Sequence, residues 1–132
     1  MSIWGYRVSV KLIAITVAVV LVGAIAAALT RPAPREVTLV ARGMAFYLET
    51  GGQPNPTLTF KAGDRVRINF RNEDRGINHN FAVPSFKAEL DPIGWNQSSD
   101  VVLNVPDAHG TYEYWCRPHM MMMRGTIQVL GP

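Results

Sequence analysis

Residues 12–29 form a stretch of 18 residues without a charged side chain, made mostly of Val, Ala, Ile and Leu. A helix of this length is about 27 Å long, close to the hydrocarbon thickness of a bilayer. Arg7 and Lys11 precede the stretch, and the usual orientation leaves the chain after it outside the cell. The sequence therefore predicts that residues 1–30 are an N-terminal anchor with one transmembrane helix over residues 12–29.

The same segment also fits a cleaved signal peptide. Basic residues precede it, and Ala24 and Ala26 lie at plausible −3 and −1 positions of a cleavage site. We favour a retained anchor, because the apolar run is longer than the hydrophobic region of a typical signal peptide. Both alternatives put the rest of the chain on the outer, periplasmic or extracellular, face of the cell membrane, either anchored or released as a soluble protein.

Residues 31–35, Arg-Pro-Ala-Pro-Arg, are typical of a short and extended tether. Residues 36–132 then remain, enough for one small all-β domain. From residue 31 onward the chain has eleven Lys and Arg against ten Asp and Glu, a net charge of +1. Because such a domain has no strong basic field, we expect no nucleic-acid partner.

Short extended segments separated by turn residues fill residues 36–132, without an amphipathic helix. The clearest segment is 65–71, where Val66, Ile68 and Phe70 share one face. Expected strands cover residues 36–42, 44–48, 57–61, 65–71, 81–83, 101–105, 111–116 and 125–130. The pattern predicts an all-β fold, a β-sandwich with Greek-key connections.

Two finer expectations concern the connections. The segments 57–61 and 65–71 are joined by Ala62-Gly63-Asp64, which predicts a β-hairpin. Residues 86–99 lack a clear period, so we expect a helical turn or an irregular crossover there.

Cys116 is the only cysteine in the chain. It has no partner for an internal disulfide, which in an oxidising compartment suggests that something else occupies the sulfur. His119 follows three residues later, and the methionine run 120–123 comes directly after it. Thiolate and thioether ligands favour Cu(I), while imidazole serves both oxidation states, so this segment predicts metal binding, with copper as the cofactor.

A second imidazole is available from His79, which lies where a polar loop meets the strand at 81–83. The loop from Cys116 to Thr126 is short, so Cys116, His119 and one methionine must crowd together at one pole of the sandwich. Taken singly, a buried cysteine, a lone histidine or a methionine run more often only packs. In combination they match the trigonal blue-copper arrangement of two imidazoles, one thiolate and a weak axial thioether.

On these motifs, residues 36–132 resemble the cupredoxins, the single-domain type 1 blue copper proteins such as plastocyanin, azurin and amicyanin. The resemblance rests on His-Asn-Phe at 79–81, on Cys-x2-His-x3-Met-Arg-Gly-Thr at 116–126, and on Gly-Thr-Tyr-Glu-Tyr at 110–114. It implies one copper ion held by four metal ligands: His79, Cys116, His119 and Met123. Met122 is the alternative axial ligand, since some family loops are one residue shorter.

The resemblance also implies roles for residues around the copper. Asn80 is placed to tie the loop of His79 to the loop of the cysteine. His119 would present a partly exposed edge as the electron port, and Met120, Met121 and Pro84 would form an apolar docking surface for a redox donor and acceptor. Contacts between such partners are small and transient. His109 lies in a turn and is expected to be an ordinary exposed residue.

The leading hypothesis is an electron transport protein that carries single electrons between larger redox complexes as copper cycles between Cu(II) and Cu(I). The alternative is a copper delivery or storage protein, which the excess of methionine favours. Multicopper oxidases and copper nitrite reductases need further histidines, and a binuclear copper site needs a second cysteine. With three histidines and one cysteine in the chain, we do not expect an enzyme.

Overall fold

The structure, a computed structural model, describes residues 10–29 and 32–131. The chain divides into two compact units, and the division falls between Ala33 and Pro34. In the first unit lies one helix, α1 (Val10–Leu29). Within the described residues, no helix combines the length and the apolarity needed to cross a membrane. The helix expected over 12–29 is present, but the structure does not support its predicted membrane-spanning role.

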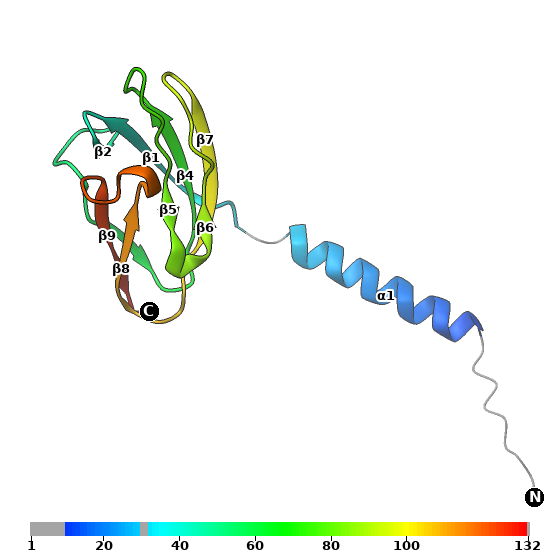
Figure 1. Ribbon diagram of the computed structural model, residues 1–132. Helices are drawn as coiled ribbons and strands as arrows, with labels where there is room; N and C mark the ends of the chain where they lie inside the picture. The colour runs from blue at the N-terminus through cyan, green and yellow to red at the C-terminus, as the bar shows by residue number, and fades with distance from the viewer. Residues whose placement is uncertain (1–9, 30–31, 132) are drawn as a thin grey trace, which may run out of the picture. The chain divides into compact units, whose positions relative to one another are not determined.

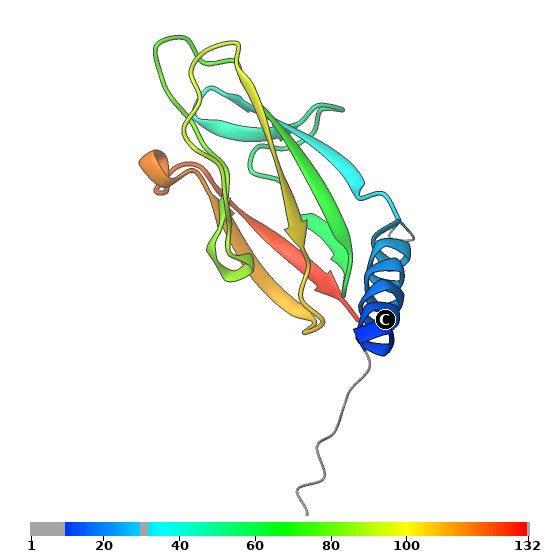
Figure 2. The ribbon, with the colours of Figure 1, turned by 90° about the vertical axis from the view of Figure 1, so that its right-hand side faces the viewer.

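The second unit is a sandwich of two β-sheets, and the predicted β-sandwich is confirmed (Figures 1 and 2). One sheet has the order β2 (Ala45–Leu48), β1 (Arg35–Arg42), β4 (Arg65–Asn72) and β7 (Ser98–Asn104). The other has the order β3 (Leu58–Lys61), β9 (Arg124–Leu130), β8 (Gly110–Trp115), β5 (Ala82–Val83) and β6 (Ala88–Glu89). Two short 3-10 helices, η1 (Pro84–Phe86) and η2 (Arg117–His119), lie between strands.

The core forms between the sheets because the strands alternate buried and more exposed residues. In β4, Val66, Ile68 and Phe70 are fully buried, and their neighbours along the strand are half-buried. Phe46 fills the centre, with its ring centroid 5.3 Å from that of Tyr114 and 5.9 Å from that of Phe70. Such tilted aromatic pairs each add about 0.5–1.5 kcal/mol beyond the burial of their area.

The predicted hairpin of residues 57–61 and 65–71 is wrong. The turn itself forms, with Asp64 Oδ2 accepting from the backbone N–H of Lys61 at 2.9 Å. However, β3 pairs in parallel with β9, whereas β4 pairs with β1 and β7 in the other sheet. The turn carries the chain across the sandwich, because the apolar faces of β3 and β4 pack toward each other from opposite layers.

The irregular segment expected at 86–99 is confirmed as a crossover. It follows the helical turn η1, includes the short strand β6, and then returns to the loop that carries His79. There, Ile93 and His79 form an isolated antiparallel bridge, with N–O distances of 3.1 and 2.8 Å in the two directions. The crossover thus fixes the backbone of His79 from one side.

Gly125 near the start of β9 brings the strand backbone very close to the ring of Tyr114. A Cβ atom there would lie 2.3 Å from Cζ and Oη of Tyr114. The Tyr114 ring is fully buried, and its hydroxyl donates to the carbonyl of Pro56 at 2.6 Å, so it has little room to move.

We therefore predict that Gly125→Ala destabilises the domain by about 1–3 kcal/mol, the usual effect of overpacking a core. Chemical denaturation of both proteins would measure this difference. The matched control is Gly131→Ala, since a Cβ atom at Gly131 meets open space. Equal unfolding midpoints for the Gly125 variant and the unmodified protein would contradict the account.

Candidate metal centre

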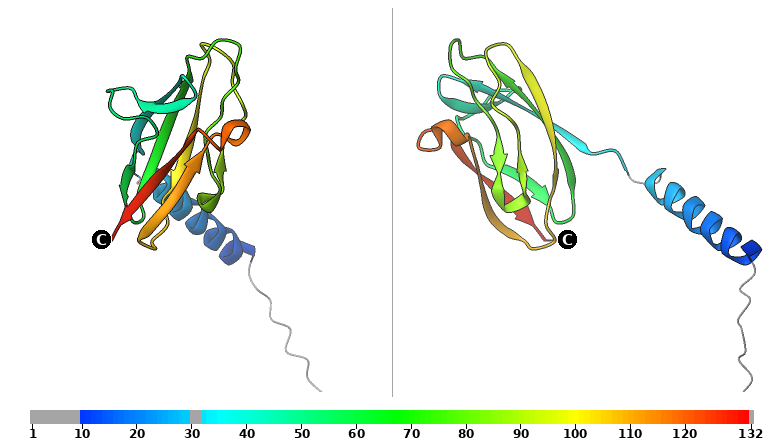
Figure 3. Two further views of the ribbon diagram at one scale, coloured as in Figure 1. Left: turned by 60° about the vertical axis from the view of Figure 1, so that its left-hand side comes forward. Right: turned by 45° about the vertical axis from the view of Figure 1, so that its right-hand side comes forward.

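The loop between β8 and β9 folds back on itself (Figure 3). Three of the predicted ligand residues lie in it or at its ends. Cys116 follows β8 directly, η2 ends at His119, and Met123 precedes β9. The backbone N–H of Cys116 donates to the carbonyl of Met123 at 2.9 Å, and that of His119 to the carbonyl of Cys116 at 3.1 Å. Pro118 within η2 has a fixed φ, which stiffens the loop further. Backbone hydrogen bonds therefore close the loop.

His79 reaches the same place from a loop 37 residues away in sequence. Its Nδ1 lies 3.7 Å from Cys116 Sγ and 3.2 Å from His119 Nδ1, and the third side, from Cys116 Sγ to His119 Nδ1, is 3.6 Å. These three residues form a group whose ligand atoms all lie within 4.8 Å of one another. The structure thus brings together the two imidazoles and the thiol that the sequence predicts.

The size of this triangle fits a single metal ion. Metal–nitrogen bonds of about 2.0–2.1 Å and a metal–sulfur bond of about 2.3 Å, as in zinc sites, give a flat trigonal arrangement with sides of about 3.5 Å and 3.8 Å. The observed sides of 3.2, 3.6 and 3.7 Å are close to these values. The ligand atoms are therefore already at the separation that coordination requires.

The protonation of His79 also suits a metal ligand. Its Nε2 lies 2.9 Å from Oδ2 of Asp74, and an ionised carboxylate can only accept hydrogen bonds. Burial lowers the pKa of His79, an effect that the nearby Asp74 only partly opposes, so the ring is neutral at neutral pH. A proton on Nε2, the nitrogen that faces this carboxylate, would leave the lone pair of Nδ1 directed at the triangle.

The sulfur of Cys116 is fully buried. Burial raises the pKa of the thiol, although hydrogen bonds from the backbone of Asn80 and His119 partly offset this effect. Without a cation the sulfur is therefore protonated. Because metal ligation requires the thiolate, metal binding at this position releases a proton.

Asn80 ties the two ligand loops together, as expected from the sequence. Its side-chain Oδ1 accepts from the backbone N–H of Arg117 at 2.7 Å, and its Nδ2 donates to the carbonyl of Leu90 at 3.0 Å. Its own backbone N–H points at Cys116 Sγ, 3.5 Å away. An ion pair between Arg117 and Glu89 spans the same junction at the surface.

The four methionines of the run 120–123 differ strongly in their exposure to solvent. Met123 is fully buried, whereas Met120, Met121 and Met122 are 41, 87 and 59 % exposed. The carbonyl of Met122 accepts from Nδ2 of Asn55 at 3.0 Å, which holds this part of the loop. Met123 is therefore the methionine of this run that lies in the buried core together with Cys116, and Met122 faces solvent.

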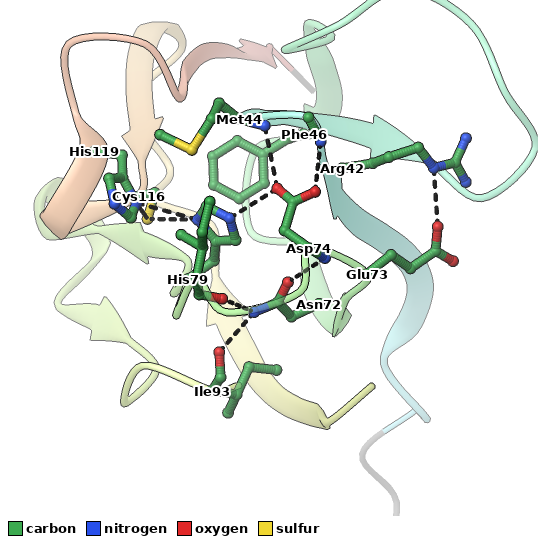
Figure 4. A network of polar contacts seen from close by, with 12 residues as sticks. Arg42, Met44, Phe46, Asn72, Glu73, Asp74, His79, Ile93, Cys116 and His119 are labelled. Atoms are coloured by element: carbon green, nitrogen blue, oxygen red, sulfur yellow. Dashed lines mark hydrogen bonds and ion pairs between the residues drawn. The ribbon is translucent and has the colours of Figure 1, made fainter. Parts of the chain in front are cut away.

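The remaining predicted residues differ in exposure, and sequence reasoning missed one residue near the triangle. His119 is half-buried, and Pro84 and His109 are exposed. Sequence reasoning gave no role to Asp74, which lies in the polar loop before His79 (Figure 4). The sequence indicates such a role only weakly, because an acidic residue in a polar loop is usually only solvated.

Comparison with known proteins agrees with this geometry. The family model described as cupredoxin-like domain matches residues 12–129. This chain therefore belongs to the cupredoxin-like family. No curated protein sequence matches it.

Two solved structures illustrate the likeness of fold. Rusticyanin from Thiobacillus ferrooxidans is 24% identical, with a TM-score of 0.58, and the match covers 72% of this chain and 76% of that chain. Auracyanin A, a "blue" copper protein from Chloroflexus aurantiacus, is 23% identical, with a TM-score of 0.60 and coverage of 74% and 100%. Together, the family and the geometry mean that His79, Cys116, His119 and Met123 are placed to form a type 1 copper site.

Proposed function

We propose that this protein is a one-electron carrier that docks transiently with larger redox complexes. Copper bound in the triangle would supply the change between Cu(II) and Cu(I). The single observation that carries the proposal is the convergence of one buried thiol and two imidazole Nδ1 atoms, with sides of 3.2–3.7 Å. Electron transport is also the general role of cupredoxins.

The protein frame suits electron transfer because it sets the ligand positions in advance. Backbone hydrogen bonds close the cysteine loop, and Asn80 and Ile93 hold the loop of His79. A carrier works best when its ligands move little between oxidation states, so this rigid arrangement favours rapid exchange of electrons. Whether the fold also imposes strain on the metal does not affect this argument.

The first prediction concerns the sulfur ligand. Domain loaded with Cu(II) should show the intense blue charge-transfer band of a copper thiolate, and Cys116→Ser should abolish it, because serine cannot supply the sulfur. Optical spectra during Cu(II) titration measure this. A colourless wild-type protein, with spectra typical of tetragonal copper, would contradict the proposal.

A second prediction concerns the axial ligand, which we propose is Met123. Met123→Leu should change both the blue spectrum and the reduction potential, since the axial ligand tunes the potential of such sites. Met122→Leu is the matched control and should leave both unchanged, because this side chain is 59 % exposed. The reverse pattern would assign the axial position to Met122.

We also propose that electrons enter and leave at His119. This ring is half-buried, and it is followed in the chain by the exposed Met120 and Met121. An apolar and adaptable surface of this kind suits brief contacts with several partners.

The third prediction tests this surface without an identified partner. Electron self-exchange between two copies should be slower in Met121→Lys, because two like charges then meet when the two copies dock through these surfaces. Line broadening in NMR spectra of mixed Cu(I) and Cu(II) protein measures the rate. Leu130→Lys adds the same charge at the other end of β9 and should have little effect. Equal rates for both variants would contradict docking at Met121.

Copper delivery is the second candidate, favoured by the three exposed methionines, since thioethers suit Cu(I). The two functions differ in redox behaviour. A carrier keeps its metal through repeated reduction and reoxidation, whereas a delivery protein passes Cu(I) to an acceptor. We propose no enzymatic activity, because once His79 and His119 are assigned to one copper, only His109 remains, fewer histidines than a second catalytic copper centre needs.

The location of the protein is a proposal from the sequence. The uncharged stretch 12–29 supports export to the outer face of the cell membrane, with the segment either retained or cleaved. Cell fractionation and a mass measurement on the native protein would distinguish these two forms, and a cytoplasmic protein of full mass would contradict export.

A further inference from the structure

Asp74 contacts the ring of His79 on the edge away from Cys116 (Figure 4). Oδ2 of the carboxylate lies 2.9 Å from Nε2 of His79. The imidazole is fully buried, and the Asp74 side chain is only 15% exposed. Asp74 thus lies next to a proposed ligand and is largely shielded from water. The set of four proposed ligands does not explain either feature.

The turn between β1 and β2 holds the carboxylate of Asp74 through two backbone N–H groups. The backbone N–H of Gly43 donates to Oδ1 at 2.7 Å, and that of Met44 donates to Oδ2 at 3.2 Å. Both residues have positive φ, 55° and 61°, and such a conformation is uncommon for methionine. Two successive left-handed residues thus direct their N–H groups at one carboxylate.

Asn72 holds the backbone of Asp74 from the other side. Its Oδ1 accepts from the backbone N–H of Asp74 at 2.8 Å, and its Nδ2 donates to the carbonyls of Ile77 and Ile93 at 2.7 and 2.8 Å. Ile93 in turn forms the backbone bridge with His79. The hydrogen bonds therefore connect His79, Asp74, Asn72 and Ile93 into a closed ring.

We propose that Asp74 is a positioning residue of the copper centre, which fixes the Nε2–H tautomer and the ring plane of His79 and lowers the reduction potential. The tautomer follows because a carboxylate accepts and cannot donate. The potential follows because an anionic partner makes the imidazole a stronger donor, which stabilises Cu(II) more than Cu(I). The statement about the potential rests on the proposed function, while the statement about the tautomer does not.

Asp74→Asn is the sharpest test, because asparagine keeps the shape of the side chain but removes its charge. In the full-length copper-loaded protein, the reduction potential of this variant should rise, and affinity for Cu(II) should fall by roughly 10–100-fold. Redox titration and competition with a chelator measure these quantities. An unchanged potential in a folded variant would overturn the proposal.

Glu73→Gln is the matched control for loss of a nearby negative charge. Glu73 precedes Asp74 in the chain but pairs with Arg42 and Arg71. If the hydrogen bond to His79 is responsible, the potential should change much less in Glu73→Gln than in Asp74→Asn. Equal shifts in both variants would assign the effect to general charge and overturn the positioning role.

The tautomer of His79 can be measured in protein without copper. Nitrogen-15 NMR of the metal-free wild-type protein should show His79 protonated at Nε2 and not at Nδ1, and Asp74→Asn should weaken this preference. A wild-type ring protonated at Nδ1 would overturn the proposal even if the variant failed to fold. If copper does not bind at all, the proposed function fails, yet this NMR result still decides the role of Asp74.

Discussion

The hydrogen bonds of Asn80 join the loop of His79 to the loop of Cys116, which are far apart in sequence. Its side chain accepts from the backbone of Arg117, and its own N–H points at the sulfur of Cys116. Together with the pairing of β5 and β8 at Ala82 and Trp115, this junction orders the loop of His79 relative to the cysteine loop. The buried amide of Asn80 therefore helps to hold the ligand atoms of the triangle at their separation.

Burial of polar groups in this domain is concentrated at the same end. Among the described residues, the buried polar side chains are Asn72, His79 and Asn80. Each is satisfied by partners that also order the site, so their desolvation is offset by hydrogen bonds. The rest of the core is apolar, with aromatic rings at its centre. Apolar packing in place of such a polar cluster is often equally or more stable, and natural proteins depart from an apolar core mainly at functional sites, which is consistent with a ligand-binding role.

Much of the fold was predictable because alternation of apolar residues reports burial directly, as in β4. The strands with which β3 and β4 pair were not predictable, because Ala62-Gly63-Asp64 forms a turn whether the chain stays in one sheet or crosses to the other. Likewise, the motif around Cys116 predicted two ligand atoms of the triangle, and His-Asn-Phe at 79–81 predicted the third. The preference for Met123 over Met122 came from the resemblance, and the burial of Met123 is consistent with it. Asp74 was missed because its role depends on the turn at Gly43 and Met44, which no local pattern indicates.

The central claim is that one metal ion bonds to the sulfur and both imidazoles at once. X-ray absorption spectroscopy of the copper-loaded protein tests it most directly, because it identifies the atoms in the first coordination shell. The account predicts one short copper–sulfur bond and two nitrogen neighbours from imidazole. A first shell of oxygen and nitrogen alone, without sulfur, would show that the triangle does not hold the metal.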